Sequence, residues 1–202
     1  MSTLTEISKQ KGSHSLGQLL EYKASESGLT GKTSFGQFKV ELYSPHIVRI
    51  AISSHKAFDD FSYAVIAQPE QVPFDLKESK DQLRLVTSGL VLEITKDPVR
   101  FRFLDLKGEV INEDEPAFGT SWIGDEITTY KKLRKEERFI GLGEKTGNLD
   151  RRGSGYTNWN TDSFAYGPDG DPLYCTMPFY IGLHDEKAYG IYLDNSFKSH
   201  FN

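Results

Sequence analysis

The feature that most constrains the fold of this chain is a two-residue alternation of apolar and polar side chains. In residues 38–52, Phe38, Val40 and Leu42 alternate with polar or amphipathic side chains, and the alternation resumes after Pro45. Successive side chains of a β-strand point to opposite faces, so this period predicts two strands joined by a turn at the proline. Strands of this kind bury one face and leave the other in water.

The same period recurs in residues 90–95 and 99–111. In the second stretch, one face carries apolar side chains and the other carries arginines: Val99, Phe101 and Phe103 against Arg100 and Arg102. The pair Lys107 and Gly108 supplies a turn at which the chain can reverse. These stretches predict further antiparallel strands.

Helical spacing is almost absent from the sequence. Residues 15–26 alone place Leu16, Leu19 and Leu20 on one helical face, and Gly17 weakens that helix. We therefore expect an all-β, mostly antiparallel chain in which two sheets pack as a β-sandwich. A length of 202 residues fits one domain over residues 1–202, with a core that needs no disulfide.

Charge and hydropathy exclude two classes of partner. The net charge is −5, and the one basic run, residues 131–138, contains two glutamates, so we expect a solvated loop or strand face there and no nucleic-acid surface. No stretch approaches the roughly eighteen apolar residues that cross a bilayer, so we expect no membrane partner. The first residues lack the pattern of a secretory signal, which predicts a cytoplasmic location.

The sequence contains no motif that indicates a metal, phosphate or catalytic site. Cys175 is the single cysteine, which excludes an intrachain disulfide and a thiolate metal cage. The glycine-rich residues 141–147 include Glu144, whose charge would repel a phosphate. The histidines show no metal-ligand spacing: His14, His46, His55, His184 and His200. We expect no metal and no cofactor, and we identify no catalytic residue, because a glycosidase carboxylate pair is defined by its separation in space.

Residues 160–172, "NTDSFAYGPDGDP", combine aspartates, glycines, prolines and aromatic side chains without a regular period. Asp, Gly and Pro are turn residues, so a surface connection accounts for the composition. The residues alone leave open whether one of the aspartates also has a chemical role.

Four stretches within residues 138–202 carry a resemblance to a known family: "FIGLGEK", "NWNTDSFAY", "DPLYCTMPFYIGL" and "AYGIYLDNSF". Together they resemble the end of the N-terminal domain of glycoside hydrolase family 31, the α-glucosidase and α-xylosidase family, and the loop tip is similar to bacterial members. The resemblance implies a galactose-mutarotase-like sandwich followed by a (β/α)8 barrel. That barrel carries the two catalytic aspartates of a retaining mechanism and needs about 250 residues, which are not in this sequence.

The resemblance also implies a substrate contact. Residues 145–173 match a loop that reaches toward the barrel's active site, and Asp162 matches an aspartate that binds sugar hydroxyls there. A carboxylate can accept hydrogen bonds from two hydroxyls. Ser163, Phe164 and Trp159 are secondary candidates, since an aromatic ring can cover the apolar face of a sugar, although we expect Trp159 in the core. We expect Asp169 and Asp171 to be turn residues only.

Three functions follow as hypotheses. The first is an accessory N-terminal domain of a retaining α-glycosidase, with its own C-terminal barrel and an α-linked glucoside or oligosaccharide as partners. The second is a free-standing carbohydrate-binding module, which needs an exposed aromatic platform. The third is a mutarotase-like isomerase, which needs a positioned acid/base pair. A gene that continues into a barrel with paired aspartates would favour the first.

Overall fold

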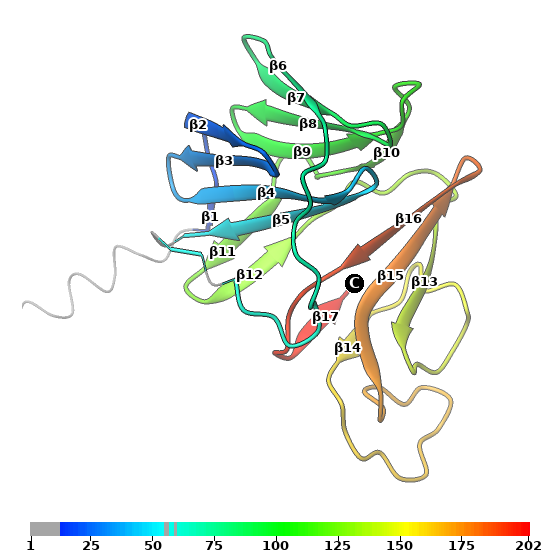
Figure 1. Cartoon of the computed structure of the whole chain (residues 1–202). Coiled ribbons are helices and arrows are strands. Elements are labelled where there is room, and N and C mark those ends of the chain that lie inside the picture. The colour runs from blue at the N-terminus through cyan, green and yellow to red at the C-terminus, as the bar shows by residue number, and fades with distance from the viewer. Residues whose placement is uncertain (1–12, 55–56, 59) are drawn as a thin grey trace, which may run out of the picture. The chain divides into compact units, whose positions relative to one another are not determined.

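The computed structural model describes residues 13–54, 57–58 and 60–202, and these residues form antiparallel strands and no helix. The prediction of an all-β fold is therefore confirmed. The chain divides into two compact units, one made of Met1–Asp60 and Ala67–Lys132 and the other of Phe61–Ile66 and Leu133–Asn202 (Figure 1). No helix with the length and apolar character required to cross a bilayer occurs in the described ranges.

The first unit contains three sheets. The four-stranded sheet has the order β2 (Leu19–Ser25), β3 (Gly28–Thr33), β4 (Gln37–Ser44) and β5 (Ile47–Ser53). The five-stranded sheet has the order β10 (Val110–Glu113), β9 (Val99–Leu104), β8 (Val91–Lys96), β7 (Gln82–Val86) and β6 (Asp75–Glu78). The small three-stranded sheet has the order β1 (His14–Ser15), β11 (Thr120–Ile123) and β12 (Glu126–Thr129).

The core of this unit lies between the four-stranded and five-stranded sheets. The rings of Phe38 in β4 and Phe101 in β9 meet edge to face, with centroids 5.3 Å apart. The alternation in β4 was interpreted correctly, because Phe38, Val40 and Leu42 are all buried. The buried side chains that join them come from both sheets: Leu29, Leu83, Leu85, Leu92, Ile94 and Val99. The two-residue alternation thus gives each sheet one apolar face, and the two apolar faces pack together as a β-sandwich.

Residues 15–26 form no helix, and most of them belong to β2. Gly17 has a positive φ of 71°, which ends regular structure before β2, and β2 then pairs with β3 along its length. Leu16 and Leu19 still contact the core. Pairing with an adjacent strand therefore decides the structure where three leucines offered only a weak helical face.

The arginine face of β9 is less exposed than the alternation predicts. Arg100 is buried, and its guanidinium donates hydrogen bonds to the carbonyls of Pro116 at 3.0 Å and Ala117 at 2.9 Å. On the neighbouring strand β8, the buried Glu93 forms an ion pair with Arg102 of β9, at 2.6 Å. The segment that follows β10 thus covers part of a face that we expected to be solvated.

The second unit contains a three-stranded sheet and a two-stranded ribbon. The sheet has the order β13 (Arg138–Gly143), β15 (Thr176–His184) and β16 (Lys187–Tyr192), and the ribbon pairs β14 (Tyr156–Asn158) with β17 (Ser199–Phe201). Tyr180 of β15 is at the centre of an aromatic cluster on one face, within 5.4 to 6.5 Å of three other ring centroids: Phe139, Tyr189 and Phe201. Burial and the charge of Glu137 raise the pKa of Tyr180.

Candidate functional site

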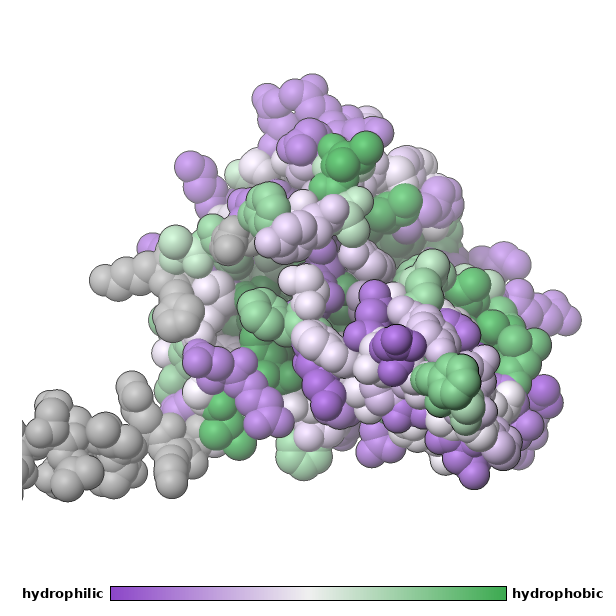
Figure 2. Space-filling model, turned by 90° about the horizontal axis from the view of Figure 1, so that it is seen from below, coloured by the Kyte–Doolittle hydropathy of each residue, from purple (hydrophilic) through white to green (hydrophobic). Residues whose placement is uncertain are grey.

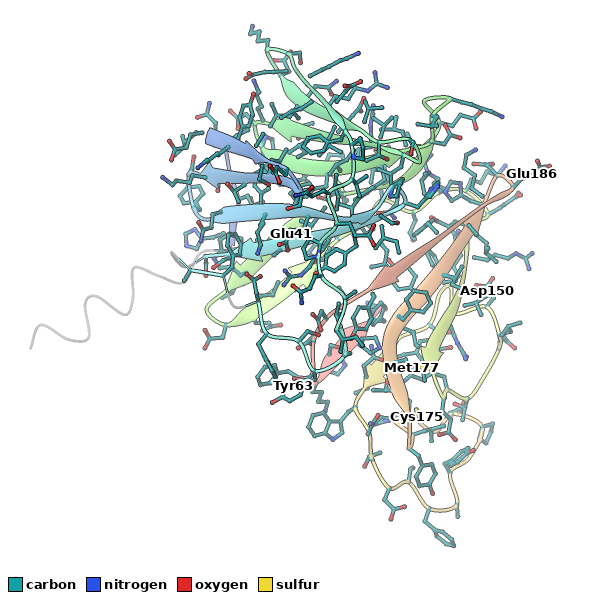
Figure 3. The ribbon with its side chains drawn as sticks, viewed as in Figure 1. Glu41, Tyr63, Asp150, Cys175, Met177 and Glu186 are labelled. Atoms are coloured by element: carbon teal, nitrogen blue, oxygen red, sulfur yellow. The ribbon has the colours of Figure 1, made fainter. Side chains whose placement is uncertain are left out.

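The predicted loop of residues 145–173 is divided by a short strand. After β13 the chain runs irregularly through residues 144–155, forms β14, and then runs irregularly through residues 159–175 before β15. Figure 3 labels Cys175 and Met177 at the point where this second stretch enters β15. We call residues 159–175 the acidic-aromatic loop.

The two ends of the acidic-aromatic loop are joined by hydrogen bonds. The backbone N–H of Thr161 donates to the carbonyl of Leu173 at 3.0 Å. The backbone N–H of Thr176 donates to the Asn160 side chain at 2.7 Å. Leu173 is buried, so an apolar side chain also closes the base. The loop therefore has a fixed base and an exposed tip.

Asp162 lies just beyond this base, and its side chain is exposed. Among the residues that the structure describes, none donates a hydrogen bond to its carboxylate. Asp150 gives the contrast, since its carboxylate accepts the backbone N–H groups of Phe139 and Arg152, which lower its pKa. Asp162 thus caps no turn, and both of its oxygens are available to a ligand.

Asp162 and Glu144 both lie close enough to Tyr174 to affect its phenol. Desolvation raises the pKa of Tyr174, and the charges of Asp162, Tyr166 and Glu144 raise it further. Glu144 is fixed nearby, because its backbone N–H donates to the carbonyl of Cys175 at 2.7 Å. The Tyr166 and Tyr174 rings lie 6.3 Å apart at 62°. This end of the unit therefore presents carboxylates beside phenol rings, which are the groups that bind sugar hydroxyls and sugar ring faces.

The secondary candidates differ in exposure. Phe164 is 90% exposed, and Ser163 is partly buried. Trp159 is 48% exposed, so the expectation that it belongs to the core is wrong. It follows β14 directly, at the start of the irregular segment that forms the loop. The core tryptophan is Trp122, in the first unit.

The sequence did not predict an ion pair that joins this loop to a buried lysine. Lys145 contacts Asp171, which we had expected to be only a turn residue, at 2.9 Å. The pair is separated by 26 positions and joins two irregular segments, so no periodicity indicates it. The neighbouring Asp169 does lie in a turn.

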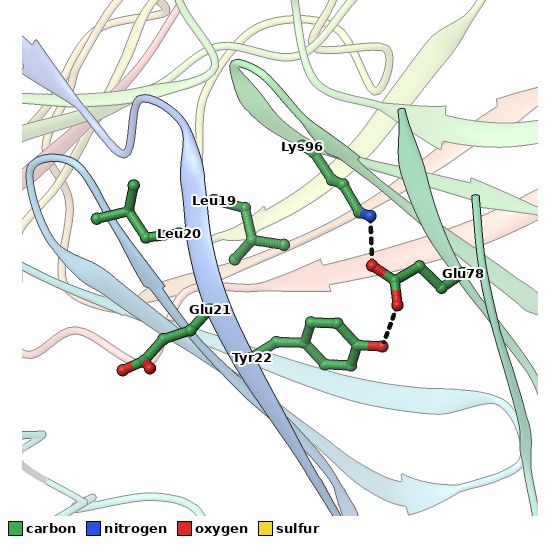
Figure 4. A pocket seen from close by; sticks show the side chains of 6 residues that line it. All are labelled: Leu19, Leu20, Glu21, Tyr22, Glu78 and Lys96. Atoms are coloured by element: carbon green, nitrogen blue, oxygen red, sulfur yellow. Dashed lines mark hydrogen bonds and ion pairs between the residues drawn. The ribbon is translucent and has the colours of Figure 1, made fainter. Parts of the chain in front are cut away.

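A hollow in the first unit is a different kind of feature. It has a volume of about 300 Å³ and lies between β2 and the β6 edge (Figure 4). Glu78 accepts hydrogen bonds there from Tyr22 at 2.9 Å and from Lys96 at 2.5 Å. These polar groups bind one another, which makes the hollow a surface ion-pair cluster rather than a site with groups left for a ligand.

Metal-ligating side chains do not converge in the described part of the chain, where no group of three His, Cys, Asp or Glu residues could hold an ion. His184 is buried and its Nδ1 lies 3.1 Å from the carboxylate of Asp185. His55 lies outside the described residues.

Comparison with known proteins places this geometry in a family. The sequence pattern of the family described as "Glycosyl hydrolase 31 N-terminal galactose mutarotase-like domain" matches residues 37–202. The chain belongs to this family. The acidic-aromatic loop is thus part of a glycosyl hydrolase 31 N-terminal domain, and the resemblance found in the sequence is confirmed.

Individual relatives agree with this assignment. The glycosyl hydrolase 31 N-terminal domain is 30% identical over 190 residues to "Alpha-glucosidase 2" of Bacillus thermoamyloliquefaciens, covering 93% of this chain and 24% of that protein. It is 37% identical over 79 residues to "Alpha-glucosidase" of Saccharolobus solfataricus, covering 39% of this chain and 11% of that protein.

A solved structure is similar over the same extent. A mutant GH31 dextranase of Flavobacterium johnsoniae in complex with isomaltotriose has a TM-score of 0.84 and 31% identity, covering 93% of this chain and 23% of the dextranase. The glycosyl hydrolase 31 N-terminal domain described here therefore spans about a quarter of the length of the relatives that it matches across most of its own length.

Proposed function

We propose that this chain is the accessory N-terminal domain of a retaining α-glycosidase and that the acidic-aromatic loop contacts the substrate of the parent enzyme. The observation that carries the proposal is the match of 93% of the chain to 24% of an α-glucosidase. The two catalytic aspartates would come from a C-terminal barrel, and the sandwich would support that barrel.

The proposed contact residue is Asp162. Its exposed carboxylate has no donor among the described residues, and the nearby Tyr166 and Tyr174 offer ring faces. A sugar with two adjacent hydroxyls could bind both oxygens of the carboxylate in charge-assisted hydrogen bonds. Phe164 could cover an apolar sugar face, since its ring is almost fully exposed.

The proposed barrel contact is one face of the second unit. Met177, Phe179 and Ile181 alternate along β15 with their side chains exposed, and Tyr192 of β16 is paired directly with Phe179. We call these four residues the apolar face. Figure 2 shows apolar side chains reaching the surface among hydrophilic ones. Exposed apolar clusters of this kind are typical of contact surfaces.

The two other hypotheses have less support. A binding module with a flat platform would need coplanar rings, whereas Tyr166 and Tyr174 are inclined at 62°. An isomerase would need an accessible acid/base pair, and the buried His184 is bound to its neighbour Asp185. Neither observation favours a second function.

The proposal is tested with two proteins, the parent polypeptide and the 202-residue chain. Both are assayed against an aryl α-glucoside, with a buffer blank and an unrelated protein purified in the same way. We expect turnover by the parent and none by the chain, because one loop cannot replace nucleophilic and acid catalysis. Turnover by the chain that persists through further purification, or a parent without α-glycosidase activity on any α-glucoside tested, would contradict it.

A further inference from the structure

We infer that Lys145 and Asp171 are a positioning pair that fixes the acidic-aromatic loop and, through it, the carboxylate of Asp162. The effect on catalysis rests on the proposed function, whereas the effect on the loop does not. Nothing in the sequence motifs assigned this role, because both residues lie in irregular segments of the second unit.

The lysine of the pair is enclosed, and the aspartate is partly buried. The Lys145 side chain is fully buried, and its Nζ donates to Asp171 Oδ1 at 2.9 Å and to the Thr157 carbonyl at 2.5 Å. The second oxygen of Asp171 accepts the backbone N–H of Thr157 at 2.5 Å. Lysine and aspartate therefore bind the carbonyl and the N–H of one residue in β14.

This arrangement joins three segments that surround the loop. Lys145 belongs to the stretch after β13, Thr157 belongs to β14, and Asp171 belongs to the returning half of the loop. A parallel bond lies beside it, since the Thr146 hydroxyl donates to the Gly170 carbonyl at 3.0 Å. Together with the bond from Thr161 to Leu173, these contacts attach both halves of the loop, whereas residues 162–169 form no hydrogen bond to any described residue outside the loop.

Burial of Lys145 and partial burial of Asp171 make this pair energetically different from an ion pair that is exposed on both sides. When one partner of a buried pair is removed, the other charge is left without compensation, and the local structure must open to solvate it. An exposed pair costs little to remove. The pair Lys32 and Glu21 in the first unit is exposed on both side chains and is a suitable comparison.

Removal of the pair should thus free the returning half of the loop. Lys145→Met keeps the length and apolar volume of the stem but leaves the partly buried carboxylate of Asp171 with hydrogen bonds from Thr157 and no positive partner. Asp171→Asn keeps the shape and is the milder change, in case Lys145→Met does not fold. Lys32→Met is the matched control, because it makes the same replacement at an exposed pair.

The first experiment measures hydrogen–deuterium exchange of the 202-residue chain. We expect Lys145→Met and Asp171→Asn to raise exchange in peptides covering residues 157–173 at least tenfold. Peptides covering residues 82–96 should be unchanged, as should all peptides of Lys32→Met. Unchanged exchange in residues 157–173 of both folded variants would overturn the inference.

The second experiment separates positioning from general support. In the parent enzyme, kcat/KM is measured for Lys145→Met, Asp162→Ala and the double variant at a temperature where all are folded. If Lys145 acts through Asp162, its replacement should cause no further loss of kcat/KM once Asp162 has been replaced. The double variant should therefore have the same kcat/KM as Asp162→Ala. Additive losses would overturn the positioning role.

The same data distinguish the two claims. If exchange rises in residues 157–173 but Asp162→Ala leaves kcat/KM unchanged, the proposed substrate contact fails and the pair's hold on the loop stands. If Asp162→Ala lowers kcat/KM while Lys145→Met changes neither exchange nor kinetics, the substrate contact stands and the positioning pair fails.

Discussion

The phenol of Tyr189 donates a 2.7 Å hydrogen bond to the carboxylate of Glu137, a side chain that is only 2% exposed. The backbone N–H of Arg134 binds the second carboxylate oxygen at 2.9 Å. Glu137 belongs to the basic run that we expected to be solvated, and most of that run is indeed a loop. The buried Glu137 connects the start of β13 to β16, and this contact stabilises the sheet from which the acidic-aromatic loop extends.

Tyr189→Phe should therefore destabilise the second unit. The change removes a hydrogen bond to a buried charge, which costs about 1.5–3 kcal/mol of unfolding free energy. Urea denaturation followed by tyrosine fluorescence measures the loss. Tyr192→Phe on the exposed face of the same strand is the control, with an expected change within about 0.5 kcal/mol. If the two variants lowered the free energy of unfolding equally, the buried hydrogen bond would make no specific contribution to stability.

Acid should weaken the attachment of the acidic-aromatic loop. Burial alone would raise the pKa of Asp171, but hydrogen bonds from Lys145 and Thr157 lower it below its usual value. A carboxyl with a lowered folded-state pKa stabilises the fold above its unfolded pKa, near 3.9, and that stabilisation is lost as pH falls through the folded value. Melting temperatures of the wild type and Asp171→Asn should therefore differ most near pH 7.

The difference in melting temperature between the wild type and Asp171→Asn should become smaller as the pH falls below about 4. The asparagine variant does not titrate at this position, so it supplies the baseline for all other carboxyls. A gap that stays constant from pH 7 to pH 3 would mean that the charge of Asp171 does not stabilise the fold.

The apolar face should cause the isolated chain to self-associate. Met177, Phe179, Ile181 and Tyr192 all lie on one face of β15 and β16, where water contacts them. Sedimentation velocity should show concentration-dependent association, and Ile181→Glu should reduce it. Ile47→Glu, at an exposed position of β5 in the first unit, is the control. A strictly monomeric chain that binds no dye for apolar surfaces would refute this prediction.

The strands of the sandwich could be predicted because their environment is periodic. Phe38, Val40 and Leu42 face one apolar layer, and a two-residue period records that directly. Residues 15–26 were ambiguous because the β3 partner that makes them a strand lies later in the chain. Arg100 was placed in solvent because the carbonyls that bind it follow sixteen and seventeen positions later.

The candidate loop could be predicted only in part. Its composition and its resemblance to family motifs indicated Asp162, but neither indicated that the side chain of Trp159 is exposed. The contact between Lys145 and Asp171 had no local signal, since the two residues meet only when β14 brings three irregular segments together. Pairings between irregular segments have no period by which a sequence could reveal them.

The central claim is that Asp162 binds substrate, and kcat/KM of Asp162→Ala in the parent enzyme tests it most directly. A charge-assisted hydrogen bond to a sugar hydroxyl is worth about 1.5–3 kcal/mol, so kcat/KM should fall about tenfold to over a hundredfold. Asp169→Ala, at an exposed turn of the same loop, should leave kcat/KM unchanged, and neither change should alter the melting temperature of the 202-residue chain. Normal kcat/KM together with a lowered melting temperature for Asp162→Ala would contradict the account and make the loop a surface connection.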